Sequence, residues 1–403
     1  MSMSDHAILA QVALGYSPMI DHDRTIIATR LTVFPMRPDA VLDAAALLET
    51  VSRVWPADGG NVSLNVVSES LLTDLLRTQP AANLMIEVPA FMAGEPGNVA
   101  ALQQLKAAGN TLLLKGRPLR ELPREVLPCF RWSIIDLADD RRAADASSGV
   151  PAGVTRSIAH VQQGIRTLAE LDASFKRGAV AVLGWPIDDS IKVQNRSKGG
   201  ARPDLQVVVE LINRVDRGDE IDALETTLKR DPMLAFKLLR YINSPLFGLR
   251  VEVNSFRHAI MLLGYQKLKR WLALLLATAG KDPNLKPVMF AAVRRGLLME
   301  ELTRSASNED LRSEAFICGV FSLLDRVFDE PFESLLKSLP VPDRVYEALA
   351  KDSGQFHPML ELVRAIESES VYDVRTAADK LFMGPLEVNR AVVRALASAR
   401  QLD

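Results

Sequence analysis

The sequence predicts two domains, an α/β domain built as a barrel or an open sheet and, after it, an all-α helical bundle. Three observations lead to this fold class. The 403 residues exceed the size of one ordinary domain. Short β-branched runs alternate with amphipathic stretches as far as residue 183, whereas no convincing strand follows residue 203. We therefore expect an α/β domain at 1–187, a linker at 188–202 and a helical domain at 203–403.

The first half contains seven strand-like runs separated by stretches with helical spacing of apolar residues. The expected strands are 7–14, 25–34, 62–67, 84–88, 111–114, 132–137 and 180–183. The expected helices are 39–54, 71–76, 98–108 and 159–175. This alternation is typical of a parallel sheet with crossover helices. Because a complete (β/α)8 barrel takes about 250 residues, the shorter first half predicts a trimmed TIM-like barrel.

The second half reads as helices throughout. Their expected spans are 207–215, 221–228, 234–242, 256–263, 268–279, 288–302, 315–327 and 359–366. Asp231 and Pro232 suit a helix N-terminus, because aspartate caps the first turn and proline needs no N–H there. Pro245 ends the helix before it, and Gly264 suits a left-handed C-cap. The polar segment with Lys198, Gly199 and Gly200 indicates the linker.

Composition narrows the class of protein. With 48% hydrophobic and 24% charged residues, the chain can bury large cores and is not of the disordered type. Its net charge of -2 excludes a general polycationic grip on nucleic acid or on an anionic membrane. The sequence shows no secretory signal and no run of about 20 apolar residues that could span a bilayer. Cys129 and Cys318 match no metal spacing, so we expect buried thiols in a cytoplasmic protein.

A series of short motifs in the second half follows the order of a known domain. Asp-Pro, Asn-Ser, Phe-Gly and Leu-Leu-Gly occur in turn within 228–264. The signature residues are Asp231, Pro232, Asn243, Ser244, Phe247, Gly248 and Gly264. The series resembles the HDOD domain, a helical relative of the HD phosphohydrolases without their metal ligands. The resemblance implies a domain that binds proteins.

The tail, 315–349, looks like the C-terminal portion of bacterial proteins that join an EAL-type barrel to an HDOD domain. EAL domains are Mg²⁺-dependent phosphodiesterases of cyclic di-GMP, and their chemistry needs carboxylates at the strand ends, a lysine and a glutamate. The first half is similar to this scaffold but departs from it at the site. The positions that correspond to the family's site are Arg30, Asn65, Glu87, Lys115, Asp136 and Arg156.

Three of these positions carry a cation where the family carries a carboxylate. Arg30 stands at the name-giving glutamate, Lys115 at the paired aspartates and Arg156 at a later glutamate. Ile134 stands at the catalytic lysine. Three cations near one rim would repel a divalent metal ion, so we expect no catalysis, no metal and no cofactor. The expected function is a non-catalytic signalling or scaffold protein that binds a protein partner through its HDOD domain. The alternatives are a cyclic di-GMP receptor and a residual cyclic di-GMP phosphodiesterase.

Other candidate sites carry weaker signals. The single His-Asp dipeptide, His22-Asp23, falls in the barrel half and is read as a chance occurrence. His258 and His357 are read as capping or packing residues rather than metal ligands. The rim cations could bind a nucleotide phosphate, because arginine suits bidentate phosphate contact, or they could be solvated or paired with nearby carboxylates. The sequence leaves both readings open.

Overall fold

The computed structural model describes residues 7–400 with several gaps. The gaps are 38–39, 57–59, 119–120, 141–157, 190–202, 229–237, 239–240, 243–252, 254–255, 279–282, 307 and 339–340. The chain forms two compact units, one of residues 1–189 with 361–397 and one of residues 190–360 with 398–403. The barrel unit therefore includes a C-terminal segment that the sequence analysis assigned to the helical half.

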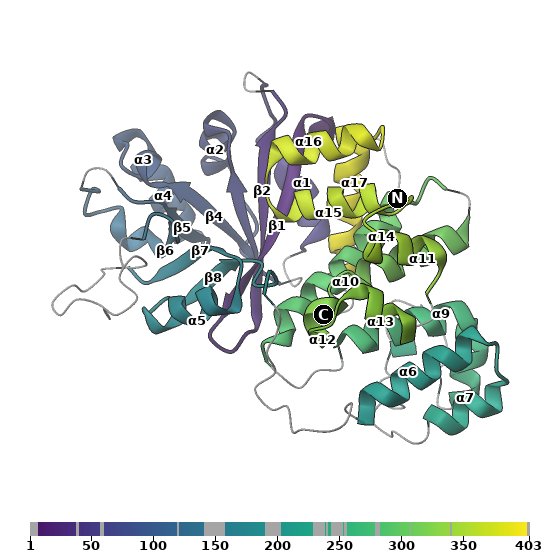
Figure 1. Cartoon of the computed structure of the whole chain (residues 1–403). Coiled ribbons are helices and arrows are strands. Elements are labelled where there is room, and N and C mark those ends of the chain that lie inside the picture. The colour runs from purple at the N-terminus through teal and green to yellow at the C-terminus, as the bar shows by residue number, and fades with distance from the viewer. Residues whose placement is uncertain are drawn as a thin grey trace. The chain divides into compact units, whose positions relative to one another are not determined.

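Eight strands close into a barrel in the order of the sequence (Figure 1). They are β1 (Val12–Asp21), β2 (Ile26–Pro35), β3 (Val62–Val66), β4 (Leu84–Pro89), β5 (Thr111–Lys115), β6 (Phe130–Asp136), β7 (His160–Ile165) and β8 (Ala181–Gly184). β1 runs antiparallel to both of its neighbours, β2 and β8, and all other pairs are parallel. The carboxyl ends of β2 to β8 consequently meet at one end of the barrel.

The barrel interior has an apolar layer and a polar layer. The apolar layer gathers side chains from seven of the eight strands: Met19, Ala28, Met85, Leu113, Ile134, Val161, Ala181 and Leu183. Successive residues of a strand alternate between its faces, so the residues two places further along β2, β4 and β5 also point inward. These are Arg30, Glu87 and Lys115, which lie nearer the carboxyl ends of their strands. The strand period thus places charged side chains inside the barrel mouth.

Short helices precede the first strand and follow most of the others. They are η1 (Ala7–Ala10), α1 (Ala44–Val54), α2 (Glu69–Leu76), α3 (Ala90–Ala93), η2 (Pro96–Asn98), α4 (Val99–Ala107), η3 (Leu127–Cys129) and α5 (Leu168–Lys176). Side chains cap several of them: Asp43 accepts from the first N–H groups of α1, and Thr167 with Glu170 forms a capping box on α5. The caps fix where each helix starts relative to the strand before it.

The sequence analysis predicted one of these elements wrongly and placed another inaccurately. A helix was expected at 159–175, but the first part of it is strand β7 and only α5 is helical. β7 is short and contains two glutamines, so its apolar residues merged with the helical spacing of α5. Residues 7–10 form a 3-10 helix, and the first strand extends to Asp21 rather than ending at residue 14. With β7 counted, the first half closes all eight strands, so the trimming expected from its length does not reduce their number.

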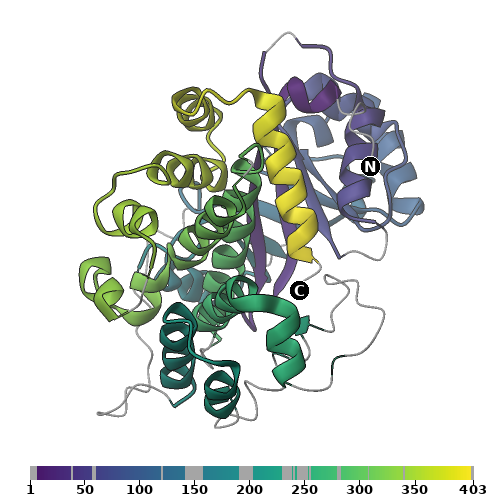
Figure 2. The same ribbon diagram turned by 90° about the vertical axis from the view of Figure 1, so that its right-hand side faces the viewer.

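The C-terminal segment packs against β1. It contains the end of α15 (His357–Glu367), then α16 (Val371–Lys380) and most of α17 (Pro385–Arg400). Figure 2 shows α17, in yellow, running beside the purple N-terminal strands. The side chain of Asn389, which is buried, accepts a hydrogen bond from Leu14 N (3.1 Å) and donates to Leu9 O (2.8 Å) and Val12 O (2.6 Å).

This amide completes the pairing of a strand. β1 pairs with β8 only over 19–21, so its first part has no strand partner on that side. Asn389 supplies the missing hydrogen bonds, and Trp185 Nε1 donates to Tyr16 O (3.2 Å) further along the same edge. An uncovered edge of this kind is a template for pairing with another chain. The C-terminal segment therefore covers an edge of the barrel that would otherwise be open.

The described residues of the second unit form helices joined by turns, with no strand among them. Its helices are α6 (Pro203–Asp216), α7 (Ile221–Leu228), α9 (Phe256–Thr278), α10 (Leu285–Leu302), α11 (Glu309–Phe321), α12 (Leu324–Phe328), α13 (Phe332–Ser338) and α14 (Asp343–Ala350). The predicted break at Gly264 is present, because this residue interrupts α9 with a φ of 67°. α10 and α11 approach closely at Gly296 and Gly319, where a Cβ on Gly319 would lie 2.5 Å from the backbone of Arg295.

No helix in the described part of the chain has the length and apolar character that crossing a membrane requires.

Candidate functional site

Five of the six expected site residues lie on consecutive strands of the barrel. Arg30 is on β2, Asn65 on β3, Glu87 on β4, Lys115 on β5 and Asp136 on β6. The parallel order of these strands brings the five residues to one end of the barrel. The sixth, Arg156, lies outside the described residues.

Arg30 and Glu87 form a buried, bidentate ion pair. Nε of Arg30 donates to Oε1 of Glu87 at 2.8 Å, and Nη2 donates to Oε2 at 2.7 Å. The Arg30 side chain is 2% exposed and that of Glu87 is 0% exposed. Ser63 Oγ adds a third hydrogen bond to Glu87 Oε1, at 2.9 Å. A parallel two-bond geometry is the strongest arrangement available to an arginine and a carboxylate.

The protonation state of Arg30 is fixed by its neighbours. Burial by itself lowers the pKa of this guanidinium, because it disfavours the charged form. The negative charges of Glu87 and Glu369, together with the hydrogen bond to Glu87, outweigh that effect and raise the pKa above its ordinary value. Arg30 is therefore a permanent positive charge inside the barrel mouth.

A residue that the sequence analysis did not single out completes the site. Glu369 comes from the turn between α15 and α16, and its Oε2 accepts from Arg30 Nη1 (3.2 Å) and Thr32 Oγ1 (2.9 Å). Its Oε1 accepts from Ser17 Oγ at 2.6 Å. No motif surrounds this glutamate in the sequence, and 339 positions separate it from Arg30. Glu369, Ser17, Thr32 and Ser63 are the members of the site that the sequence did not reveal.

Lys115 lies in the same polar layer. Its Nζ donates to Oδ1 of Asn65 at 2.8 Å, and Nδ2 of Asn65 donates to Thr32 Oγ1 at 3.2 Å. Burial, the largest influence, lowers the pKa of Lys115; the positive charge of Arg30 acts in the same direction, and the charges of Glu87 and Glu369 oppose it. The hydrogen bonds link Lys115 to Glu369 through Asn65 and Thr32.

The residues of this site do not fit a divalent metal ion. Mg²⁺ needs several oxygen ligands in a nearly octahedral arrangement. Both oxygens of Glu87 accept hydrogen bonds from Arg30, and the amide oxygen of Asn65 accepts one from Lys115. The carboxylate of Asp136 accepts from the N–H of Ala138 at 2.9 Å, in its own turn. Within the described ranges no group of three or more His, Cys, Asp or Glu residues could hold a metal ion.

The lowered pKa of Lys115 predicts a specific dependence of stability on pH. Between that lowered pKa and the ordinary value of 10.5, the unfolded chain binds more protons than the folded chain. The free energy of unfolding then rises with pH. We expect wild type to gain stability relative to Lys115→Met as the pH rises through this alkaline window, measured by urea unfolding at several pH values. A difference between the two proteins that does not change with pH would contradict the lowered pKa.

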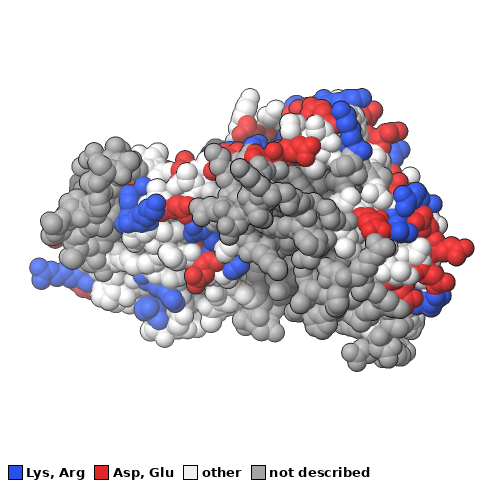
Figure 3. All heavy atoms as spheres, turned by 60° about the horizontal axis from the view of Figure 1, so that its bottom comes forward, with Lys and Arg blue, Asp and Glu red and all other residues white. Residues whose placement is uncertain are grey.

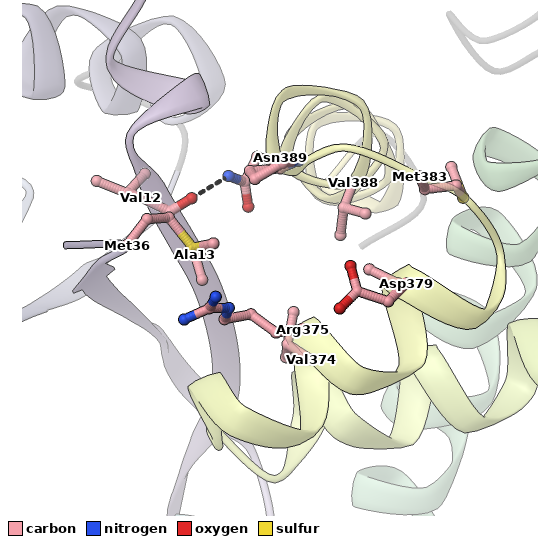
Figure 4. Close-up of a pocket in the computed structure, with 11 residues that line it drawn as sticks. Val12, Ala13, Met36, Val374, Arg375, Asp379, Met383, Val388 and Asn389 are labelled. Carbon is pink, nitrogen blue, oxygen red and sulfur yellow. Dashed lines mark hydrogen bonds between the residues drawn. The ribbon is translucent and has the colours of Figure 1, made fainter.

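A pocket of about 230 Å³ lies between β1, Met36 just after β2, and the helices α16 and α17 (Figure 4). Its walls are mainly apolar and include Val12, Val374 and Val388, while Arg375 and Asp379 add two charges. Asn389, which hydrogen-bonds to the backbone of Val12, also lines it. The pocket follows from the packing of the C-terminal segment on β1 and is separate from the polar layer in the barrel mouth.

The remaining expected features are placed as follows. Of the HDOD signature, the structure describes Gly264, and the other six residues lie outside the described residues. Cys129 and Cys318 are buried and form no disulfide, as expected. His22 and Asp23 are largely exposed. On the face shown in Figure 3, acidic and basic side chains of the described residues are interspersed, in keeping with the small net charge.

Comparison with known proteins identifies one domain family within the chain and two similar proteins. Residues 203–328 match the HDOD domain family. The chain is 23% identical over 309 residues to the cyclic di-GMP phosphodiesterase CdgJ of Vibrio cholerae, a match that covers 75% of this chain and 70% of that protein. It is 31% identical over 166 residues to the uncharacterized protein YuxH of Bacillus subtilis, and this match covers 40% of each chain.

Among solved structures, the phosphodiesterase PaMucR in complex with c-di-GMP matches with 21% identity and a TM-score of 0.34. The match covers 44% of this chain and 96% of that one. The fold itself is given by the strand order described above. The chain has an eight-stranded barrel and then a helical region that contains an HDOD domain, and this order fits the EAL–HDOD arrangement that the sequence motifs predicted.

Proposed function

We propose that this chain is a non-catalytic signalling or scaffold protein of a cyclic di-GMP pathway, acting in a bacterial cytoplasm through a protein partner of its HDOD domain. The observation that carries the proposal is the ion pair between Arg30 and Glu87 at the position of the family's name-giving glutamate. A phosphodiesterase of this type would need both positions to bind a metal ion. Here Arg30 stands at the first position and carries a positive charge, and the carboxylate of Glu87 at the second position is paired with it.

The hydrogen bonds around this pair support the same conclusion. Lys115 stands where the family carries aspartate, and its ammonium group bonds to Asn65 instead of leaving that oxygen to a cation. Glu369 occupies the side of Arg30 that Glu87 does not. The relative CdgJ is named a phosphodiesterase. Because this chain carries Arg30 and Lys115 at these positions, we do not extend that activity to it.

Turnover of cyclic di-GMP tests the catalytic part of the proposal. We expect the purified full chain to leave cyclic di-GMP intact with Mg²⁺ or Mn²⁺, as followed by chromatography of the nucleotide. Asp136→Asn removes a carboxylate that remains at the barrel mouth and serves as the matched control. Hydrolysis by wild type that is lost in Asp136→Asn would overturn the proposal and establish residual phosphodiesterase activity.

A cluster of exposed apolar side chains supports the partner-binding part. Met261 and Leu262 lie just before the break of α9 at Gly264 and Tyr265 lies just after it, inside the region that matches the HDOD family, and they are 55%, 47% and 38% exposed. We expect the full chain to retain a partner from a native extract and the Met261→Asp/Leu262→Asp variant to lose it. Val41→Asp, at an exposed apolar residue of the barrel unit, should retain the partner. Equal capture by all three proteins would contradict a role for this face.

A cyclic di-GMP receptor is the alternative, and the two cations in the barrel mouth favour it. Arg30 and Lys115 could contact a phosphate only if their present acceptors gave way. Calorimetry with cyclic di-GMP on wild type and on Lys115→Met distinguishes the two functions. Saturable binding by wild type that Lys115→Met weakens would favour the receptor, and no binding favours the scaffold.

A further inference from the structure

The turn between α15 and α16 places a carboxylate inside the barrel mouth. Glu369 accepts three hydrogen bonds from two strands: from Ser17 on β1 and from Arg30 and Thr32 on β2. All three donors are buried, at 4%, 2% and 1% exposure. Both oxygens of the carboxylate are used, one by Ser17 and the other by Arg30 and Thr32. The donors thus form a complete receptor for one anionic group.

The backbone around this carboxylate is shaped to admit it. Gly15 pairs with Thr32 in the strand register and has no side chain at the point where the turn enters. A Cβ on Gly15 would lie 3.0 Å from Ile366 O and 3.1 Å from Glu369 Cα. Glu369 itself has a φ of 55°, a left-handed conformation that is unfavourable for a residue with a side chain. The bonds to the carboxylate offset that cost.

We propose that Ser17, Arg30 and Thr32 form a binding site for a carboxylate or a phosphate, and that Glu369 is its tethered ligand. The turn that bears Glu369 then occupies this binding site and blocks it to other anions. A free anion of the right size competes with it for the same three donors. The site shares Arg30 with the Arg30–Glu87 pair, but its members are hydrogen-bond donors and its ligand is an anion rather than a metal ion.

The turn that bears Glu369 follows a helix that belongs to both compact units. α15 runs from His357 to Glu367, and the division between the two compact units falls within this helix, after residue 360. Glu369 follows α15 by two residues. Release of the carboxylate by a competing anion would free the end of a helix whose first turn belongs to the unit that contains the HDOD region.

Chemical rescue tests the site directly. Glu369→Ala removes the carboxylate and leaves its place open, so we expect a lower thermal midpoint that formate raises saturably, by about 2–4 °C or more. Acetate and inorganic phosphate form parallel arms that show which anions fit. Chloride replaces each anion to hold the ionic strength constant. Wild type should respond less than Glu369→Ala, because its site is filled.

Two control variants make the result specific. Glu369→Gln fills the same space without charge and should gain less from formate than Glu369→Ala. Glu361→Ala removes a carboxylate of α15 that pairs with Lys380 at the surface, and it should show no rescue. Equal responses to formate in wild type, Glu369→Ala and Glu361→Ala would overturn the proposal.

Gly15→Ala supplies a second test that keeps every polar group of the site. Its methyl group would lie 3.0 Å from Ile366 O and 3.1 Å from Glu369 Cα, so it should push the turn outward and weaken the hydrogen bonds of the Glu369 carboxylate. We expect this variant to be less stable than wild type and to be rescued by formate, as Glu369→Ala is. Loss of stability without any rescue by formate, acetate or phosphate would show that the turn packs against Gly15 without serving as an anionic ligand, and would overturn the proposal.

Discussion

Replacement of Arg30 by methionine is expected to lower the free energy of unfolding of the barrel unit by about 3–5 kcal/mol, the usual cost of leaving one partner of a buried ion pair behind. Glu87 is fully buried and, among the described residues, would keep only the hydrogen bond from Ser63. Glu369 would lose one of its three donors at the same time. Urea unfolding followed by tryptophan fluorescence measures the change.

The double variant Arg30→Met/Glu87→Leu separates the cost of an orphaned charge from the loss of packing. Because it removes both charges, it should recover most of the stability that Arg30→Met loses. Arg166→Met breaks an exposed pair with Asp188 and should change stability by less than about 1 kcal/mol. A double variant no more stable than Arg30→Met would contradict the buried-pair explanation.

The Asn389→Leu variant is expected to lose about 3 kcal/mol or more, since each buried backbone group left without a partner costs about 1–3 kcal/mol. The amide serves Leu14 N, Leu9 O and Val12 O, and leucine can serve none of them. Thermal unfolding measures the loss, and hydrogen exchange at Leu14 should accelerate locally. Asn61→Ala, which removes a single exposed hydrogen bond to Ile27 O, should have a much smaller effect. Equal effects of the two substitutions would show that Asn389 does not hold the edge of β1.

Much of the fold could be predicted from the sequence because its elements are local. Strand-helix alternation, the break at Gly264 and the all-helical second half each depend on residues close together in the chain. β7 was missed because a six-residue strand is too short to be distinguished from the helix that follows it. The capping box formed by Thr167 and Glu170 marks where that helix begins and was the available signal.

The position of the C-terminal segment could not be predicted in the same way. An amphipathic helix shows which of its faces is buried but not which core it joins. α16 and α17 therefore read as part of the helical half, although they pack in the barrel unit. Asn389 looks like any polar residue of a helix until the unpaired edge of β1 lies beside it.

Part of the candidate site was predictable because its residues lie in motifs that are local in the sequence. Arg30, Asn65, Glu87, Lys115 and Asp136 were found because each occupies a motif position on its own strand. The sequence left open whether the rim cations bind a phosphate or pair within the chain. In the structure Arg30 pairs with Glu87, and Lys115 donates a hydrogen bond to Asn65. Glu369 belongs to no motif, and only the folded chain brings it to Arg30.

Binding of Mn²⁺ tests the central claim most directly, because the claim is that the chain's own cations and its own glutamate fill the barrel mouth. Electron paramagnetic resonance of free Mn²⁺, titrated into the full chain, measures how much metal is bound. The account predicts no stoichiometric binding by wild type. It also predicts that Asp136→Asn, which removes a carboxylate that accepts a hydrogen bond from the N–H of Ala138, leaves the titration unchanged. Saturable binding of one or two Mn²⁺ ions per chain that is lost in Asp136→Asn would contradict it.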